Sequence, residues 1–445
     1  MGKDLTKGPV IPGLMAFALP MILGNLLQQC YNIADTLIVG RYLGKNALAA
    51  VGSSFTLMTF LTSILLGLCM GSGALISQKY GEKDIPGLRQ RLTGSFRLIA
   101  GVTLALNILV YLLLDSVKTF LQVPQEAWTP MREYLAVIYA GIFATFLYNY
   151  FASMLRAVGN SAAPLVFLAI SAVLNIALDL LFVVTRNRGC AGAAEATVIA
   201  QYVSGVGLML YTYLAVPELR IRRVGKITCL GEVARFSALT CVQQSVMNLG
   251  ILLVQGRVNH FGSAVMAAVA AGVKIDAFAY MPVQDFGNAF STFAAQNYGA
   301  RQSERIRSGF RGALAWSGGF CLVISGLVWI FARQLIGIFV LPQETDILAV
   351  GVQYLRTEGA FYIGIGWLFL LYGIYRGLGK PGMSVVLTVI SLGLRVILAY
   401  ALSAIPALGV AGIWWSVPIG WVIADLVGLL YYRQKKTEML PAQKE

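Results

Sequence analysis

The sequence predicts an all-α membrane protein with twelve transmembrane helices in two repeated lobes of six. Three observations lead to this prediction: the composition, a series of long apolar segments, and an internal repeat. Of the 445 residues, 58% are hydrophobic and only 12% are charged. Soluble globular domains carry about 25% charged residues, so this composition excludes that class.

The apolar segments have the length of membrane-spanning helices. A helical span needs about 20 mostly apolar residues, whereas the strands of a membrane β-barrel are short and alternate in polarity. Segments such as 55–68 are continuously apolar. We expect twelve helices near residues 14–40, 52–78, 94–115, 132–155, 164–185, 192–214, 236–258, 270–295, 314–333, 354–376, 384–404 and 411–432.

The distribution of basic residues predicts the orientation. If the N-terminus is cytoplasmic, 23 of the 34 Lys and Arg residues fall in cytoplasmic segments and nine in outer loops, while Lys274 and Arg395 lie within helices. This positive-inside bias places both termini in the cytoplasm of a bacterial inner membrane. Topology and anionic lipid account for the net charge of +14, so no nucleic-acid partner is expected.

The two halves of the chain repeat one another. Gln78-Lys-Tyr-Gly81 recurs as Gln296-Asn-Tyr-Gly299 at an offset of 218, and Arg156-Ala-Val-Gly159 recurs as Arg376-Gly-Leu-Gly379 at an offset of 220. Each copy crosses the membrane six times, an even number, so both copies enter the membrane with the same orientation. The pseudo-twofold axis should therefore follow the membrane normal. Parallel repeats of this kind are a transporter architecture. We expect an N-lobe at 1–216, a cytoplasmic linker at 217–235 and a C-lobe at 236–445.

Four polar residues fall inside predicted spans at similar depth. Asp35 lies near the outer end of the first span, where an ionised carboxylate is costly. Asn175 and Asp179 are four residues apart and share one face of the fifth span, and Thr197 lies near the start of the sixth. Given the topology, each lies roughly 7–10 Å below the outer edge. We expect these side chains to converge on one pocket.

The chemistry of this pocket suits a coupling cation. Two neighbouring carboxylates in a low dielectric cannot both ionise cheaply, so one is expected to hold a proton. The same oxygens could instead bind Na⁺, and both ions remain alternatives; no other cofactor is expected. The second-half counterparts of the four residues are Leu253, Arg395, Ala399 and Val417. The ion site is therefore predicted in the N-lobe only.

Other polar side chains are candidates for a substrate cavity. Asp285 is expected near mid-membrane on the same helix face as Lys274, either paired with it through a bridging group or as an anion facing a cationic substrate. Aromatic and amide side chains suit amphipathic cations, and the predicted liners are Gln28, Tyr31, Asn32, Tyr148 and Asn149. We expect small organic substrates, cationic or amphipathic, and a monomeric protein.

Several motifs, in order, resemble the multidrug and toxic compound extrusion (MATE) family over nearly the whole chain. They include Pro20, Asn32-Ile-Ala-Asp35, Leu155-Arg-Ala-Val-Gly159 and Gln296-Asn-Tyr-Gly-Ala300. The resemblance implies two lobes that alternate between outward- and inward-facing states and export toxic compounds in exchange for H⁺ or Na⁺.

The resemblance also implies roles for single residues. Positions matching Asp35, Asn175, Asp179 and Thr197 form the N-lobe cation site of the DinF-like branch, and Pro20 matches a hinge proline whose helix bends when that site is protonated. Another branch carries acids in its seventh and tenth helices. We expect none inside these helices here.

Three other functions compete with efflux. A flippase for lipid-linked oligosaccharides belongs to the same superfamily but needs a basic cavity for diphosphate, and only Lys274 and Arg395 are candidate interior bases. A passive channel would not accumulate substrate. An intramembrane enzyme is disfavoured because no metalloprotease motif is present, and the absence of a phosphate-binding loop argues against transport driven by ATP. An ion-coupled efflux antiporter is the prediction.

Overall fold

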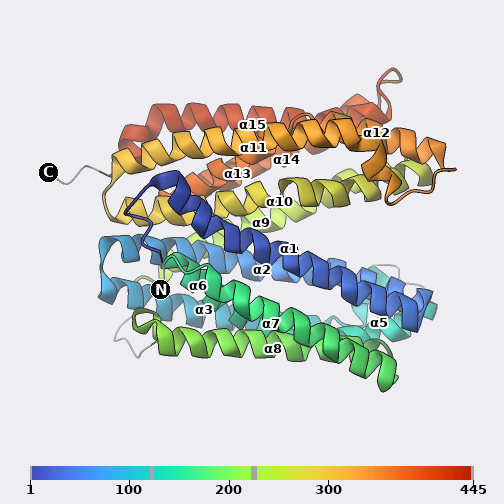
Figure 1. Ribbon diagram of the computed structural model, residues 1–445, viewed down its shortest axis with the longest axis horizontal. Helices are drawn as coiled ribbons and strands as arrows, with labels where there is room; N and C mark the ends of the chain where they lie inside the picture. Colours follow the sequence, from blue (N-terminus) through green and yellow to red (C-terminus); the bar gives the residue numbers. More distant parts are fainter. Residues whose placement is uncertain (1–2, 121–124, 222–227, 442–445) are drawn as a thin grey trace. The chain divides into compact units, whose positions relative to one another are not determined.

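The computed structural model describes residues 3–120, 125–221 and 228–441, and its regular elements there are helical. Eleven of these helices are long and apolar enough to cross a membrane. A twelfth span is formed by α12 (Thr345–Gly359) and α13 (Tyr362–Gly377), which meet at a bend of 49°. The structure thus confirms the predicted twelve-helix plan (Figure 1).

The chain divides into two compact units, which we call the first and second lobes. The first lobe comprises Met1–Asp4 and Leu19–Cys241. Its helix α1 occupies Val10–Leu43, and α7 and α8 lie side by side within it (Figure 1). The remaining elements are α2 (Lys45–Glu82), α3 (Ile85–Leu112), α4 (Ser116–Phe120), α5 (Gln125–Ile138), η1 (Tyr139–Gly141), α6 (Ile142–Ala157), α7 (Ala162–Asp179), η2 (Leu180–Thr185), α8 (Gly189–Ala215) and η3 (Pro217–Leu219).

The second lobe comprises Leu5–Ala18 and Val242–Glu445. Its interior is built largely by α13, which packs against α10, α11, α14 and α15. Besides α12 and α13, its helices are α9 (Leu230–Asn259), α10 (Ser263–Gly299), α11 (Ser303–Gly337), α14 (Pro381–Ser403) and α15 (Val410–Met439).

Helix boundaries reproduce the sequence repeat. Helices α2 and α10 begin at Lys45 and Ser263, an offset of 218, and α5 and α12 begin at Gln125 and Thr345, an offset of 220. Because the same two offsets relate the sequence motifs, each lobe is one copy of the repeated unit.

Helices α1 and α9 each contribute to both lobes. The segment Leu5–Ala18 belongs to the second lobe, where Asn297 Nδ2 donates to the Leu5 carbonyl at 3.2 Å. The first part of α9, up to Cys241, belongs to the first lobe. Pro20 lies two residues beyond Ala18, and its ring removes one hydrogen bond from α1. The predicted hinge proline therefore stands where α1 passes from one lobe to the other.

Helix α2 approaches α9 through two glycines one turn apart. A Cβ on Gly67 would lie 2.6 Å from Cys241 Cα, and one on Gly71 would lie 2.6 Å from the Phe236 carbonyl oxygen. Glycines four residues apart let helix backbones pack closely in a membrane. Any side chain at these two positions would force α2 and α9 apart.

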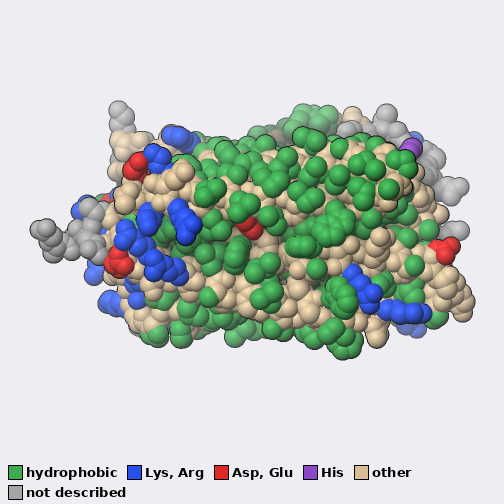
Figure 2. Space-filling view, turned by 90° about the horizontal axis from the view of Figure 1, so that it is seen from above, with side chains coloured by type: hydrophobic (Ala, Val, Ile, Leu, Met, Phe, Trp, Pro, Cys, Tyr) green, Lys and Arg blue, Asp and Glu red, His purple; other side chains and the backbone are tan. Residues whose placement is uncertain are grey.

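Apolar side chains cover the surface where lipid is expected. Leu112, Val173 and Leu214 each expose more than 70% of their surface. Figure 2 shows a broad band of hydrophobic side chains on the face in view, with Lys and Arg gathered toward its ends. An apolar band between charged ends is the surface expected of a protein in a bilayer.

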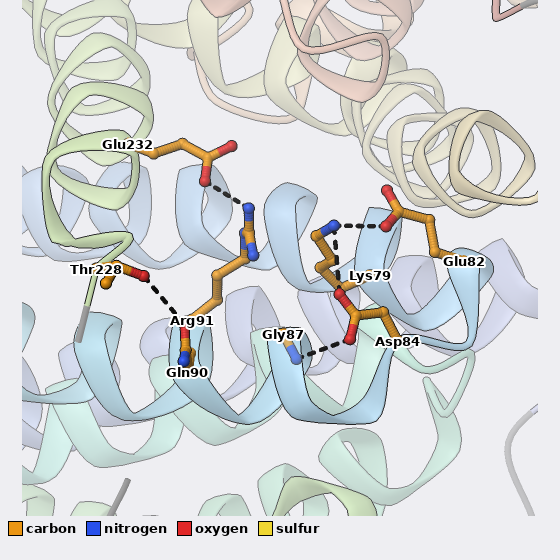
Figure 3. A network of polar contacts seen from close by, with 8 residues as sticks. All are labelled: Lys79, Glu82, Asp84, Gly87, Gln90, Arg91, Thr228 and Glu232. Carbon is orange, nitrogen blue, oxygen red and sulfur yellow. Dashed lines mark hydrogen bonds and ion pairs between the residues drawn. The ribbon is translucent and has the colours of Figure 1, made fainter. Parts of the chain in front are cut away.

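A polar network closes the turn between α2 and α3 (Figure 3). Asp84 caps α3, because its Oδ1 accepts from the Gly87 amide at 2.9 Å, and its Oδ2 lies 3.4 Å from Lys79 Nζ. On α3, Arg91 forms an ion pair of 2.6 Å with Glu232 of α9. The Arg91–Glu232 ion pair attaches the start of α9 to the first lobe.

The glycine contact predicts a steric effect on stability. Replacing Gly71 with Val should lower the free energy of unfolding by about 1–3 kcal/mol, because the added atoms overpack the contact with α9. Thermal unfolding of the purified protein in detergent measures the effect. Gly101→Val is the matched control, since a Cβ at exposed Gly101 meets nothing within 4 Å. Equal melting temperatures for both variants would contradict the close packing.

The Asp84 cap predicts a pH dependence. The Gly87 amide and the Lys79 ammonium hold the pKa of the Asp84 carboxyl below its usual value. The contribution of the Asp84 carboxylate to the free energy of unfolding is therefore complete above the unfolded pKa of about 3.9. It is lost as pH falls through the lower pKa of the folded state. Asp84→Ala should cost about 1 kcal/mol at neutral pH, and this difference from wild type should shrink in acid.

Thermal unfolding over a range of acid to neutral pH tests the Asp84 prediction. Asp84→Asn is the control, because asparagine keeps an oxygen acceptor for Gly87 but carries no charge. Its stability should exceed that of Asp84→Ala at neutral pH. A cost of Asp84→Ala that does not change with pH would show that the charge is irrelevant.

Candidate ion-coupling site

Asp179 stands at an irregular point of the fifth span. It is the last residue of α7, is fully buried, and is followed by the π-helical turn η2. Neither of its carboxylate oxygens has a hydrogen-bond partner among the described residues. Single π turns occur frequently at functional sites, because they redirect side chains within a helix.

Asp35 of α1 faces Asp179 across the helices. The two carboxyl groups lie close enough to interact directly. Asp35 Oδ1 is also buried and, within the described chain, has no hydrogen-bond partner. The structure thus brings together the two acids that the sequence predicted to share a pocket.

Asn175 and Thr197 form the other half of the predicted site. Asn175 Nδ2 donates to Thr197 Oγ1 at 3.2 Å, and Thr197 Oγ1 donates to the Ala193 carbonyl at 3.1 Å. Asn175 Oδ1 is buried, with no partner in the described residues. Because Asn175 is one turn before Asp179 on α7, its open oxygen belongs to the same helix face.

The donor set fits a proton or a hard cation. Four buried oxygens lack a hydrogen-bond donor in the described residues: Asp35 Oδ1, Asn175 Oδ1 and both oxygens of Asp179. A buried acceptor without a donor is costly, and oxygen atoms of carboxylates and amides are the ligands that hard cations prefer. A proton shared by the acids or a bound Na⁺ would satisfy these atoms.

Tyr134 of α5 is a neighbour that the sequence analysis missed. It is buried and interacts electrostatically with both Asp35 and Asp179, as does Tyr31. No motif singled it out, because a tyrosine in an apolar segment is ordinary. The only available signal was the repeat, in which Tyr134 corresponds to Tyr354 at the offset of 220.

The predicted cavity residues have different surroundings. Tyr148 donates from its hydroxyl to the Pro164 carbonyl at 3.1 Å, and Asn149 Nδ2 donates to the Thr145 carbonyl of its own helix at 2.8 Å. Both polar groups are thus engaged in helix contacts. Tyr31 and Asn32 are half-buried and Gln28 is exposed, all on α1.

Lys274 and Asp285, both on α10, also differ in environment. Lys274 is exposed, and its ammonium lies 5.5 Å from the centre of the Phe339 ring. Asp285 is buried. A role for Asp285 in substrate binding remains a prediction.

One expectation about the second lobe is wrong. We expected no acid inside the tenth span, yet Glu358 lies on α12 with only 4% of its surface exposed, beside buried Asp276 of α10. Neither acid occupies a position equivalent to one of the four predicted site residues, so the repeat gave no signal for them. The counterparts of Asp276 and Glu358 in the first half are Met58 and Ile138.

Two copies of a six-helix unit, with a buried acid pair open to a cation, define the class of a polytopic membrane transporter. The comparisons with known proteins narrow this class. The family model described as MatE matches residues 20–181 and 238–401, one match in each half of the chain. The chain belongs to the MatE family, which favours the efflux prediction over the flippase alternative.

Relatives match over nearly the full chain. "Probable multidrug resistance protein YpnP" of Bacillus subtilis is 31% identical, with 97% of this chain and 96% of the relative covered. YoeA of the same organism, also described as a probable multidrug resistance protein, is 28% identical, with 96% of this chain and 94% of the relative covered. A solved outward-facing MATE transporter has the same fold, with a TM-score of 0.92, 23% identity and 99% of each chain covered.

The Asn175–Thr197 contact yields a test of the site. Thr197→Val removes the acceptor for Asn175 Nδ2, and an unsatisfied buried donor costs about 1–3 kcal/mol, so ion-driven transport should fall roughly ten-fold or more. Thr197→Ser should restore it. Transport by purified protein in proteoliposomes is the measurement.

Thr212→Val serves as the control for Thr197→Val. Thr212 lies on the same helix, and its hydroxyl donates only to the Leu208 carbonyl of that helix at 2.7 Å. Its replacement should leave transport near the wild-type rate. If both valine variants transport equally well, Thr197 has no part in the site.

Proposed function

We propose that this protein is a cation-coupled antiporter that exports small organic compounds from bacterial cells. As a member of the MatE family, it is a multi-pass membrane transporter. The relatives named as multidrug resistance proteins support a broad range of small substrates. The coupling ion, H⁺ or Na⁺, binds in the first lobe at Asp35, Asn175, Asp179 and Thr197.

One observation carries the proposal: two acids interact in a buried pocket whose oxygens lack donors among the described residues. Structural carboxylates in helix packing normally have their oxygens paired. Here the open acceptors belong to α1 and α7, so a cation that neutralises Asp35 and Asp179 also joins these two helices. Its release leaves two adjacent negative charges, which repel each other.

Helix α1 contains a point at which this change of charge can bend the helix. Asp35 and Pro20 lie on the same helix, and Pro20 stands where α1 passes between lobes. A proline inside a helix is the commonest cause of a bend. We infer that ion binding at Asp35 changes the bend of α1 at Pro20 and so favours one of the two access states.

The remaining features of the proposal follow from sequence and composition. The excess of Lys and Arg in the predicted cytoplasmic segments supports cytoplasmic termini and an inner-membrane location. The substrates are amphipathic cations, supported by the aromatic and amide side chains of α1 at Gln28, Tyr31 and Asn32. The antiporter works as a monomer because each chain holds both lobes.

Replacing Asp35 with Asn tests the coupling role. Because asparagine cannot take up a proton and carries no charge, Asp35→Asn should reduce ion-driven efflux at least a hundred-fold, while the protein still inserts and folds. The measurement uses proteoliposomes loaded with a fluorescent organic cation, with a pH gradient and a Na⁺ gradient imposed separately. Wild-type transport driven by only one gradient identifies the ion.

Asp115→Asn is the matched control for Asp35→Asn. Asp115 is an exposed acid of the same lobe, paired with Arg132 at 2.8 Å. Its loss should leave efflux unchanged. Full gradient-driven transport by Asp35→Asn would refute the coupling site, and substrate that only equilibrates in the wild type would indicate a channel.

A further inference from the structure

Arg376 is a buried cation of the second lobe. It lies in the last turn of α13, which ends at Gly377, and only 4% of its surface is exposed. An arginine side chain stays charged at every pH that a folded protein meets. Its surroundings therefore have to compensate the charge, because the charge cannot be removed by loss of a proton.

Two neutral side chains of α10 hold the guanidinium. Arg376 Nε donates to Ser291 Oγ at 2.9 Å, and Arg376 Nη2 donates to Asn288 Oδ1 at 3.0 Å. Asn288 and Ser291 are three residues apart and share one face of α10. They fix one edge of the planar guanidinium, but neither of them carries a negative charge.

Close packing of α10 and α13 keeps Arg376 in this position. A Cβ on Gly377 would lie 2.8 Å from the Ser291 carbonyl oxygen, and a Cβ on Gly373 would overlap the Gly287 carbonyl oxygen. These two glycines lie on either side of Arg376 in the sequence. The backbones are thus in contact around the arginine, so its side chain cannot swing out to solvent without separating the helices.

Within the described chain, no acid compensates the charge of Arg376. The guanidinium forms no ion pair there and has no electrostatic interaction with a titratable group. This holds for Asp285 as well, although Asp285 is only one turn before Asn288 on α10. The C-terminal end of α13 contributes roughly half a negative charge through the helix macrodipole, which offsets only part of the cationic charge.

The hydrogen atoms left over at this site all belong to donors. Asn288 and Ser291 receive the arginine through their oxygens, which leaves the Asn288 amide hydrogens and the Ser291 hydroxyl hydrogen without an acceptor among the described residues. Arg376 itself uses Nε and Nη2 for these contacts, so the edge formed by Nη1 and Nη2 keeps hydrogens for a further partner. Such an edge pairs with two oxygens of a carboxylate or a phosphate. The site therefore has the donor set of an oxyanion site.

The first lobe has the arginine without its partners. The counterpart of Arg376 at the offset of 220 is Arg156, whereas the counterparts of its two partners at the offset of 218 are Met70 and Gly73. Neither of these offers a strong hydrogen-bond acceptor. Arg156 is accordingly only partly buried, and its Nε has no partner in the part of the chain that the structure describes. The fixed, buried guanidinium is thus a property of the second lobe and is not required by the repeated fold.

The position of Arg376 along the tenth span favours a phosphate. Arg376 is the last residue of the predicted span 354–376, at the end that the positive-inside bias assigns to the cytoplasm. Lipid headgroups lie at this depth, and basic pockets between helices on the cytoplasmic side are a recurring kind of headgroup site. Lys380, four residues further on, is exposed and adds positive charge at the same end.

We propose that Arg376, together with Asn288 and Ser291, binds a phosphate group at the cytoplasmic end of the second lobe. The phosphate belongs to an anionic phospholipid or is free inorganic phosphate, since both present the oxyanion that pairs with the guanidinium. This goes beyond the proposed antiport. The phosphate binds whether or not the first-lobe ion site drives transport.

Thermal unfolding of the full-length protein in detergent tests binding of inorganic phosphate. The wild type, first exchanged into phosphate-free buffer, should melt at a higher temperature as sodium phosphate is added, because a ligand that binds only the folded state stabilises it. Sodium chloride at equal ionic strength should not produce this shift. Arg376→Gln should lose the shift. Arg376→Lys keeps the charge but not the planar fork, so it should bind phosphate roughly ten-fold more weakly.

Native mass spectrometry tests binding of a lipid. Protein released from nanodiscs that contain equal amounts of phosphatidylglycerol and phosphatidylcholine should retain phosphatidylglycerol, because the choline group cancels the charge of the other headgroup. Arg376→Gln should retain roughly five-fold less of it. A wild type that is stabilised by sodium phosphate but shows no preference between the two lipids identifies free phosphate as the ligand.

Arg433→Gln is the matched control for Arg376→Gln. Arg433 is exposed near the C-terminal end of α15, which is predicted to lie on the same side of the membrane. The control removes the same charge without touching the buried site. It should respond to phosphate and to phosphatidylglycerol as the wild type does.

Three results would overturn the proposal. One is a wild type that gains no stability from phosphate and shows no preference for phosphatidylglycerol. Another is a folded Arg376→Gln variant that responds to both as the wild type does. A third is equal stabilisation by chloride and phosphate, which would show a general effect of anions. None of these measurements needs transport, so a failure of the first-lobe coupling site would leave them unchanged.

Discussion

Acid groups buried at membrane depth constrain this structure more than any other feature. Away from water, a carboxylate is tolerated only if hydrogen bonds, a counter-charge, a proton or a cation compensates it. In the first lobe, Asp35 and Asp179 adjoin each other, and their open oxygens have no donor among the described residues. In the second lobe, Tyr354 and Tyr362 donate to Asp276, and Arg395 Nη2 lies 3.9 Å from Glu358 Oε1. In the first lobe, a proton or a small cation would supply the compensation that these oxygens lack, and this is the basis of the proposed ion coupling.

The repeat was duplicated as a fold and then diverged in its polar positions. The offsets of 218 and 220 relate helix boundaries as well as motifs, which means that the backbone plan was kept. Tyr134 and Tyr354 are polar residues retained at equivalent places, each beside buried acids. Arg395 stands where the first half has Asn175, a permanent cation in place of an open acceptor, and this difference fits the different neighbours of the two residues. A neutral amide with an open oxygen suits the proposed cation pocket, whereas a guanidinium suits a pocket that holds the two acids Asp276 and Glu358.

The sequence could predict the parts that depend on hydropathy and periodicity. Twelve spans, the repeat, and the meeting of Asn175 with Thr197 and of Asp35 with Asp179 all follow from segment length and helical spacing. Local backbone irregularities were not predictable, because the π turn after Asp179 occurs in a plain apolar stretch, Leu-Leu-Phe-Val-Val-Thr. The two buried acids of the second lobe were missed for another reason. Asp276 and Glu358 are far apart in the sequence, and only the packing of α10 on α12 shows that they share Tyr354.

In each lobe, the acids lie beside a point where a helix is irregular. Asp179 precedes the π turn, Asp35 shares α1 with Pro20, and Glu358 precedes the break in the tenth span. Regular helices satisfy the hydrogen bonds of their own backbone and resist bending. A change of charge on such a helix therefore does not readily change its direction. At an irregular point, two backbone arrangements differ by little free energy, and the cost of one buried charge is enough to select between them. In the proposed antiport, the placement of acids next to Pro20, the π turn and the tenth-span break converts the binding of an ion into a change of helix direction.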